Sequence, residues 1–225
     1  MPNDKIGFLQ RSHWLKLLLE LIAVFVGITA GFFFENFREE RANRILERKF
    51  LASLYSNVKS DSSEIRDYLN GFKENLEIAG RTLTIMDSTR VEIDSALALL
   101  GILGYYSDLL LQEATYESIV NSGKLDLITD YSIRNDILSY YQNVRFVQNV
   151  DQVYNNYIDN FVMPYLFEQL DFLTGEVSDQ FDPNGKDFRN VSIAYYTMVD
   201  AKVDLAGKLD SLNHQLLTSL MPYTQ

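Results

Sequence analysis

The feature that most constrains the fold is the apolar stretch from Trp14 to Phe34, WLKLLLELIAVFVGITAGFFF. Between Leu17 and Phe34 its only charged residue is Glu20. As a helix rising about 1.5 Å per residue, the stretch reaches about 31 Å, close to the roughly 30 Å thickness of the hydrocarbon layer of a bilayer. Apolar side chains occupy nearly every direction around its axis, whereas a helix buried in a globular protein normally keeps a polar side. We therefore predict a membrane-spanning helix over residues 13–34.

A cleaved signal peptide is the alternative for an apolar stretch near the N-terminus. The apolar core is longer than the usual run of about 7 to 15 residues, and no A-x-A-like cleavage site follows before Glu35. The sequence therefore favours an uncleaved anchor. We expect a polar N-terminal tail over residues 1–12 before it, and a charged helical stalk over residues 35–49 after it.

One side of the predicted anchor differs from the rest. Glu20, Ala23, Gly27, Gly31 and Glu35 follow the i, i+3, i+4 spacing that places residues on one face of a helix. Small residues at this spacing let a second helix approach closely, although Gly and Ala are also common in membrane helices generally. A carboxyl group inside a membrane costs about 2.5 to 3.5 kcal/mol unless it meets a partner or water. We predict that these five residues, the anchor face, bind a helix of a second copy or of another membrane protein.

The charge distribution argues against nucleic acid as a partner. Residues 50–225 hold 12 Lys and Arg against 25 Asp and Glu, whereas residues 1–49 hold 8 against 6. So acidic a segment repels phosphates, and no basic stripe with interleaved aromatics is present in the sequence. With 47% hydrophobic residues and only 4 prolines in the whole chain, residues 50–225 are expected to form one soluble domain.

The side of the membrane on which this domain lies is ambiguous from charge alone. Basic residues are more numerous after the apolar stretch than before it, which mildly favours a cytoplasmic domain. They are interleaved with Glu, however, and long domains cross membranes largely regardless of charge. We expect a single-pass anchor in a bacterial inner membrane, with the C-terminal domain in the periplasm.

The rest of the chain has helical patterning. No proline occurs between Glu35 and Asp87, and apolar residues recur there at helical spacing, so one long helix is predicted, with bends at Gly71 or Gly80. Two short helices follow, near 93–104 and 108–122, and Gly123 is expected as the C′ residue of the second.

Asp130 is expected to cap a long helix that breaks near Pro164, and a last helix is predicted from about Phe188 to Leu220, stopped by Pro222. The fold class is therefore all-α: an N-terminal transmembrane helix that continues into a long helix, which packs in an antiparallel helical bundle.

Residues suited to catalysis or metal binding are scarce. The two histidines, His13 and His214, have no partner at metal-ligand spacing, and Cys is absent. The segment Asp182-Pro183-Asn184-Gly185 resembles part of a calcium loop but departs from its ligand spacing, and it fits a type I turn. Nucleophile, P-loop and dinucleotide motifs are missing from the sequence. We expect no enzymatic activity, no cofactor and no metal site.

Two segments resemble a family of uncharacterised bacterial single-pass membrane proteins, a domain of unknown function. The first is the anchor, with its E-x6-G-x3-G pattern from Glu20 to Gly31. The second is TYESIVNSGKLDLI, residues 115–128, which is similar to that family's T-Y-x-x-[LIV]-x-x-S-G-x-L-x-L-I segment. Phe37 stands where the family usually has Trp. The resemblance implies a one-pass anchor and a helical domain, and it implies no activity.

These observations favour a non-enzymatic structural or accessory subunit. Its anchor face would associate with a second copy, as a homo-oligomer, or with a larger membrane protein complex. The alternative is a periplasmic sensory or ligand-binding helical bundle that signals through a partner, since the sequence shows no second membrane-spanning stretch before Gln225.

Overall fold

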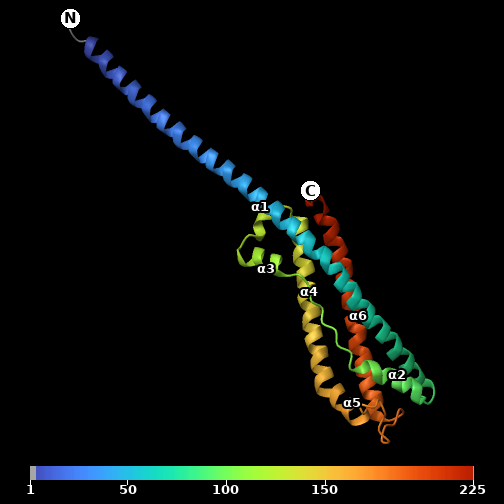
Figure 1. Cartoon of the computed structure of the whole chain (residues 1–225). Helices are drawn as coiled ribbons and strands as arrows, with labels where there is room; N and C mark the ends of the chain where they lie inside the picture. The colour runs from blue at the N-terminus through green and yellow to red at the C-terminus, as the bar shows by residue number, and fades with distance from the viewer. Residues whose placement is uncertain (1–3, 225) are drawn as a thin grey trace. The chain divides into compact units, whose positions relative to one another are not determined.

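The computed structural model describes the backbone of residues 4–224 and the side chains of Trp14 and of residues 16–224. Contacts within the chain divide it into two units, Met1–Lys49 and Phe50–Gln225. Helix α1 (Asp4–Ser88) includes most of the first unit and the beginning of the second (Figure 1). All the regular secondary structure of the described residues is helical, which confirms the all-α fold class.

In the first unit, α1 begins earlier than predicted. The expected start near His13 is wrong, because the chain is already helical from Asp4, and the rest of the expected tail, residues 1–3, lies outside the described residues. No proline lies between Asp4 and His13, and the single Gly7 costs a helix only about 1 kcal/mol. Among the residues that were described, this is the one helix long and apolar enough to cross a membrane.

In the second unit, three long helices enclose the core: α1 from Phe50 onward, α4 (Tyr131–Tyr157) and α6 (Lys186–Leu220). Each presents apolar residues at helical spacing to the centre, as the sequence pattern predicts. In α1 these include Leu51, Leu54, Val58, Ile65 and Phe72, all buried.

The three helices do not alternate in direction. Asp61 and Tyr68 of α1 bond to Tyr140 and Asp151 of α4 respectively, so residue numbers rise together and α1 runs parallel to α4. α6 is antiparallel to both, because its Asn213 bonds near the start of this part of α1, at Val58. The predicted antiparallel arrangement thus holds for α6, and a parallel pair accompanies it.

A parallel pair requires a connection that returns along the bundle. After the predicted short helix α2 (Ile93–Leu103), residues 105–113 have no regular secondary structure, and we call them the crossing segment (Figure 1). Its side chains bond to α4 and to the helical turn directly after it, in reverse order of residue number. The pairs are Tyr106 with Asp159, Asp108 with Asn155 and Glu113 with Gln148.

The second short helix predicted over 108–122 is therefore wrong in its first part, since α3 covers only Ala114–Asn121. The physical reason is that side chains of the bundle bond to the backbone of the crossing segment. The amides of Leu109 and Gln112 donate to buried carboxylates, and the Tyr154 hydroxyl donates to the Tyr105 carbonyl. These bonds replace those that a helix would make.

Local signals at the helix ends are confirmed. Gly123 has φ +67° and its amide donates to the Val120 carbonyl, which together with the Lys124 amide bonding to the Ile119 carbonyl forms a Schellman motif. Asp130 Oδ1 accepts the amides two and three residues ahead, at 2.8 and 3.2 Å, and so caps α4.

The predicted break at Pro164 appears as a change of helix type. A π-helical turn, η2 (Ile158–Val162), separates α4 from α5 (Met163–Gln169). Proline lacks the amide that an α-helix needs at that point, and the wider turn absorbs the missing bond. A 3-10 turn, η1 (Leu125–Leu127), follows α3, and another, η3 (Met221–Tyr223), follows α6.

The segment from Asp182 to Gly185 is a turn, as predicted. The Gly185 amide donates to the Asp182 carbonyl at 2.9 Å, and Asp182 Oδ1 accepts the Asn184 amide at 2.9 Å. The Asn184 side chain then bonds to both backbone groups of Val91, at 2.8 and 3.2 Å. The turn therefore fixes the start of α6 to the connection between α1 and α2.

Candidate functional site

The anchor face predicted from the sequence lies on α1 in the first unit. Glu20 and Ala23 are exposed, and a Cβ atom built at Gly27 or Gly31 would meet no described heavy atom within 4 Å. Glu35 bonds to Arg38 one turn further on, at 2.7 Å, and both side chains are largely exposed. Helical geometry brings the five residues onto one face, and the described part of this chain places nothing against them.

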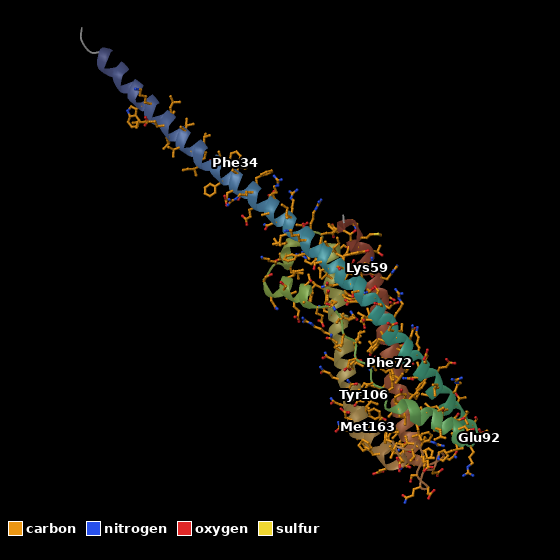
Figure 2. The ribbon with its side chains drawn as sticks, viewed as in Figure 1. Phe34, Lys59, Phe72, Glu92, Tyr106 and Met163 are labelled. Atoms are coloured by element: carbon orange, nitrogen blue, oxygen red, sulfur yellow. The ribbon has the colours of Figure 1, made fainter. Side chains whose placement is uncertain are left out.

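The apolar side chains around this face are equally uncovered. Within the most apolar 18-residue window of α1, none of the residues is buried. Phe25, Phe32 and Phe34 are each about two-thirds exposed or more, and Figure 2 shows the side chain of Phe34 projecting from the helix. Burying one such side chain is worth about 1.5 to 3 kcal/mol. The described residues therefore leave these apolar side chains uncovered, and burying them requires contact with other molecules.

A second candidate lies inside the bundle, where two carboxylates are buried. Asp61 of α1 accepts the Gln112 amide at 2.9 Å on one oxygen and the Tyr140 hydroxyl at 2.9 Å on the other. Asn213 of α6 approaches the same Tyr140 hydroxyl at 3.4 Å and accepts a bond from Ser62 at 2.8 Å. We call these five residues the Asp61 cluster.

Burial raises the pKa of Asp61 above its ordinary value, because the carboxylate loses water. The hydrogen bonds from Gln112 and Tyr140 favour the charged form and oppose that shift, whereas the nearby Glu113 and Glu64 add to it. Burial and the neighbouring carboxylate likewise raise the pKa of Tyr140, so its hydroxyl remains a proton donor.

The second buried carboxylate, Asp151 of α4, lies two to three turns further along. It accepts the Tyr68 hydroxyl at 2.5 Å and the Leu109 amide at 3.1 Å. Its Oδ1 atom also lies 3.1 Å from Nζ of Lys202, and both side chains are buried. The approach of this ammonium falls outside hydrogen-bond angles, so the contact is an ion pair by distance. We call Tyr68, Asp151, Lys202 and the Leu109 amide the Asp151 cluster.

Aromatic rings surround the buried ammonium of Lys202. Nζ lies 3.9 Å from the ring centre of Tyr154, 4.0 Å from that of Phe72 and 5.3 Å from that of Tyr68. Ring faces attract a cation, and more strongly where water is excluded. Burial lowers the pKa of Lys202, and the charge of Asp151 opposes that shift. The rings and the carboxylate together replace the lost hydration of the ammonium.

The two clusters have the same plan. Each contains an Asp from one of the parallel helices, a Tyr from the other helix and a backbone amide from the crossing segment. Each also has a polar residue from α6, either Asn213 or Lys202. Because every carboxylate oxygen is engaged by the bundle itself, the plan fixes helix register and the path of the crossing segment, and it presents no group to a substrate.

Sequence reasoning missed both clusters, although a signal was present. Asp61, Asp151 and Lys202 each occupy a position that the helical pattern assigns to the core, as in Val144, Val147, Asp151, Tyr154 and Ile158. A charged residue at such a position is expensive unless it is paired. The pattern identifies the buried charges, but the partners are distant in sequence and appear only in the fold.

The aromatic series of α4 and its continuation divides between core and surface. Tyr140, Tyr141 and Tyr154 are buried, as the helical spacing predicts for core residues, whereas Tyr131, Phe146 and Phe161 are more than half exposed. None of the exposed members lines the cleft of about 340 Å³ at the end of the bundle. That cleft is lined by residues of α5 and the turn before α6, including Tyr165, whose pKa burial raises to about 12.

His214 and the carboxylates around Gly185, which were weighed as metal ligands from the sequence, are not gathered into a metal-ligand group among the described residues. No group of three or more His, Asp or Glu side chains in the described chain is arranged to hold a metal ion. His214 is exposed, and the side chain of His13 lies outside the described residues. Asp182 uses its carboxylate to close its own turn, which fits the turn interpretation of that segment.

Comparison with protein-family models, with curated proteins and with solved structures found no match to this chain. The family resemblance of residues 115–128 therefore stays a prediction. In the structure this segment is α3, its Gly123 cap and η1. Ile128 is buried, and Asp126 pairs with Arg134 at 2.8 Å, so the segment has a packing role within the bundle.

We expect Asp151→Ala to lower the free energy of unfolding by about 3 to 5 kcal/mol, because it leaves Lys202 buried without its carboxylate. Lys202→Met should cost less, since Asp151 keeps two hydrogen bonds and a thioether packs well among aromatic rings. Denaturant unfolding of the full chain in detergent measures both values. Asp200→Ala, an exposed change on α6, is the control and should stay within about 0.5 kcal/mol of wild type. Equal losses for Asp151→Ala and Asp200→Ala would contradict the ion pair.

The raised pKa of Asp61 predicts a pH dependence of stability. Between the unfolded-state pKa and the higher folded-state pKa, the folded protein binds more protons, so this group stabilises the fold as pH falls. The free energy of unfolding of wild type should therefore rise relative to that of Asp61→Asn as the pH falls from about 7 toward the ordinary Asp pKa of about 4. Unfolding both proteins across this range checks the sign, and a difference that is flat or falls with decreasing pH would show that the pKa is not raised.

Proposed function

We propose that this chain is a non-enzymatic, membrane-anchored helical-bundle protein that acts as a structural or accessory subunit. The observation that carries the proposal is the uncovered apolar part of α1, where the most apolar window has no buried residue. Lipid covers the purely apolar directions of such a helix at no cost. Lipid alone does not stabilise the side of the helix that carries Glu20, because a carboxyl group in hydrocarbon is costly.

The anchor face is the surface through which the subunit associates. Gly27 and Gly31 leave open space of the kind that a second helix fills by close backbone approach. A partner helix also provides polar groups that can bond to the Glu20 carboxyl within the membrane. The partner is a second copy of this chain, which makes a homo-oligomer, or a larger membrane protein of which this chain is an accessory subunit.

Replacing both glycines tests this association. Gly27→Leu with Gly31→Leu fills the space that the partner backbone needs, so the double variant should be recovered from nanodiscs as a single 26.0 kDa chain. Thr29→Leu is the matched control, because Thr29 lies two residues from each glycine and faces nearly the opposite side. Wild type and the control should be recovered with further chains, identified by the mass of the intact particle and by peptide sequencing. A solitary wild-type chain, or an unchanged particle in the double variant, would contradict the proposal.

We place the anchor in a bacterial inner membrane with the bundle in the periplasm. The chain lacks Cys, so Asn70→Cys, at an exposed site of α1 in the second unit, gives a single reactive thiol. A membrane-impermeant maleimide should label this thiol in cells whose outer membrane is permeabilised. Labelling that appears only after the inner membrane is broken would place the bundle in the cytoplasm.

A further inference from the structure

The outer side of α4 carries an apolar stripe that the bundle covers only in part, since Val150 and Tyr157 are half-buried. Phe146, Val150, Val153, Tyr157 and Phe161 follow one another at intervals of three or four residues, and we call them the outer stripe. Phe146, Val153 and Phe161 are 52%, 60% and 65% exposed. The rings of Tyr157 and Phe161 stack with centroids 5.9 Å apart, so the stripe continues across the π-helical turn. Contiguous exposed apolar surface of this kind marks an interaction site.

The helix that carries the outer stripe has few charged residues, although Arg145 and Asp159 are exposed. The sequence from 137 to 167 has three charged residues, and the bundle engages all of them. Asp151 pairs with Lys202, Asp159 accepts the Tyr106 hydroxyl, and Arg145 lies over a ring of α3. Most of the exposed polar residues beside the stripe are carboxamides. They are Asn149, Gln152, Asn156 and Asn160.

This chemistry selects a second copy as the occupant. Residues 50–225 carry a large negative charge, so two copies repel each other everywhere except where a face lacks carboxylates. A carboxamide both donates and accepts hydrogen bonds, so identical amides can pair across a two-fold axis. A basic partner would need carboxylates on this face, and an anionic lipid surface would need Lys or Arg. An apolar stripe edged with amides is complementary to itself.

We propose that a second copy of this chain docks on the outer stripe, α4 against α4, about a two-fold axis. The inference rests on the proposed function, because anchors that associate in one membrane hold two bundles at high effective concentration. It goes beyond that function by assigning the partner, a second copy, and a contact in the soluble part of the chain. At that concentration a modest apolar contact is sufficient for pairing.

Single cysteines in the full chain, oxidised in native membranes, test the inference. Asn156→Cys places a thiol beside the outer stripe and should give a crosslinked pair of identical chains on a non-reducing gel. Asn70→Cys is the matched control, an exposed helical asparagine on α1, and should give at most a tenth of that yield. Ala23→Cys places a thiol in the anchor face and reports on the proposed function separately.

The outcomes distinguish the two proposals. A crosslink at Ala23→Cys without one at Asn156→Cys overturns the docking inference and leaves the proposed function standing. A crosslink at Asn156→Cys alone supports the docking inference and contradicts self-association through the anchor face. Equal yields at Asn156→Cys and Asn70→Cys indicate random collision and overturn the inference, as does a crosslink from Asn156→Cys to a different protein.

A second variant tests whether the crosslink depends on the outer stripe. Val153→Glu, added to Asn156→Cys, places a carboxylate at the centre of each facing stripe and should lower the crosslinked yield about tenfold. Val153 is largely exposed in one chain, so the variant should keep the thermal unfolding midpoint of its parent. An unchanged yield with an unchanged midpoint would overturn the docking inference.

Discussion

A buried carboxylate needs partners for its oxygens, and in this bundle that requirement determines the path of the chain. Asp61 and Asp151 lie on two parallel helices, and each receives one hydroxyl from the opposite helix and one amide from the crossing segment. The non-helical conformation of residues 105–113 follows from these bonds, because they take amides that a helix would use. Parallel packing of α1 and α4 depends in turn on the crossing segment, which brings the chain back along the bundle.

The sequence predicted those parts of the fold that depend on neighbouring residues. The caps at Asp130 and Gly123, the turn at Asp182 and the break near Pro164 each follow from side chains within a few positions. The core faces of the long helices also follow from spacing. The helix start at Asp4 was missed, although Pro2 and Asn3 directly before it are residue types that mark a helix start.

The crossing segment was not predictable for a different reason. Its apolar residues suit a short buried helix as well as an extended strand, and the choice between them depends on carboxylates that lie 42 and 51 positions away. The buried charges could be found as interruptions of the apolar pattern, but their partners could not. The anchor face, by contrast, is a pattern on one helix and stays a prediction, because its occupant is not encoded in that helix.

The bonds that close the bundle also set when it can form during synthesis. Asn213 bonds to the Val58 carbonyl across 155 positions, and Lys202 reaches Asp151 from the last helix. Contacts of such long range delay folding, since the chain between them must be ordered first. While residues 1–185 are being made, both Asp61 and Asp151 lack α6, so the core stays open until α6 (Lys186–Leu220) has been made. The two buried carboxylates therefore stay in water until α6 has been made.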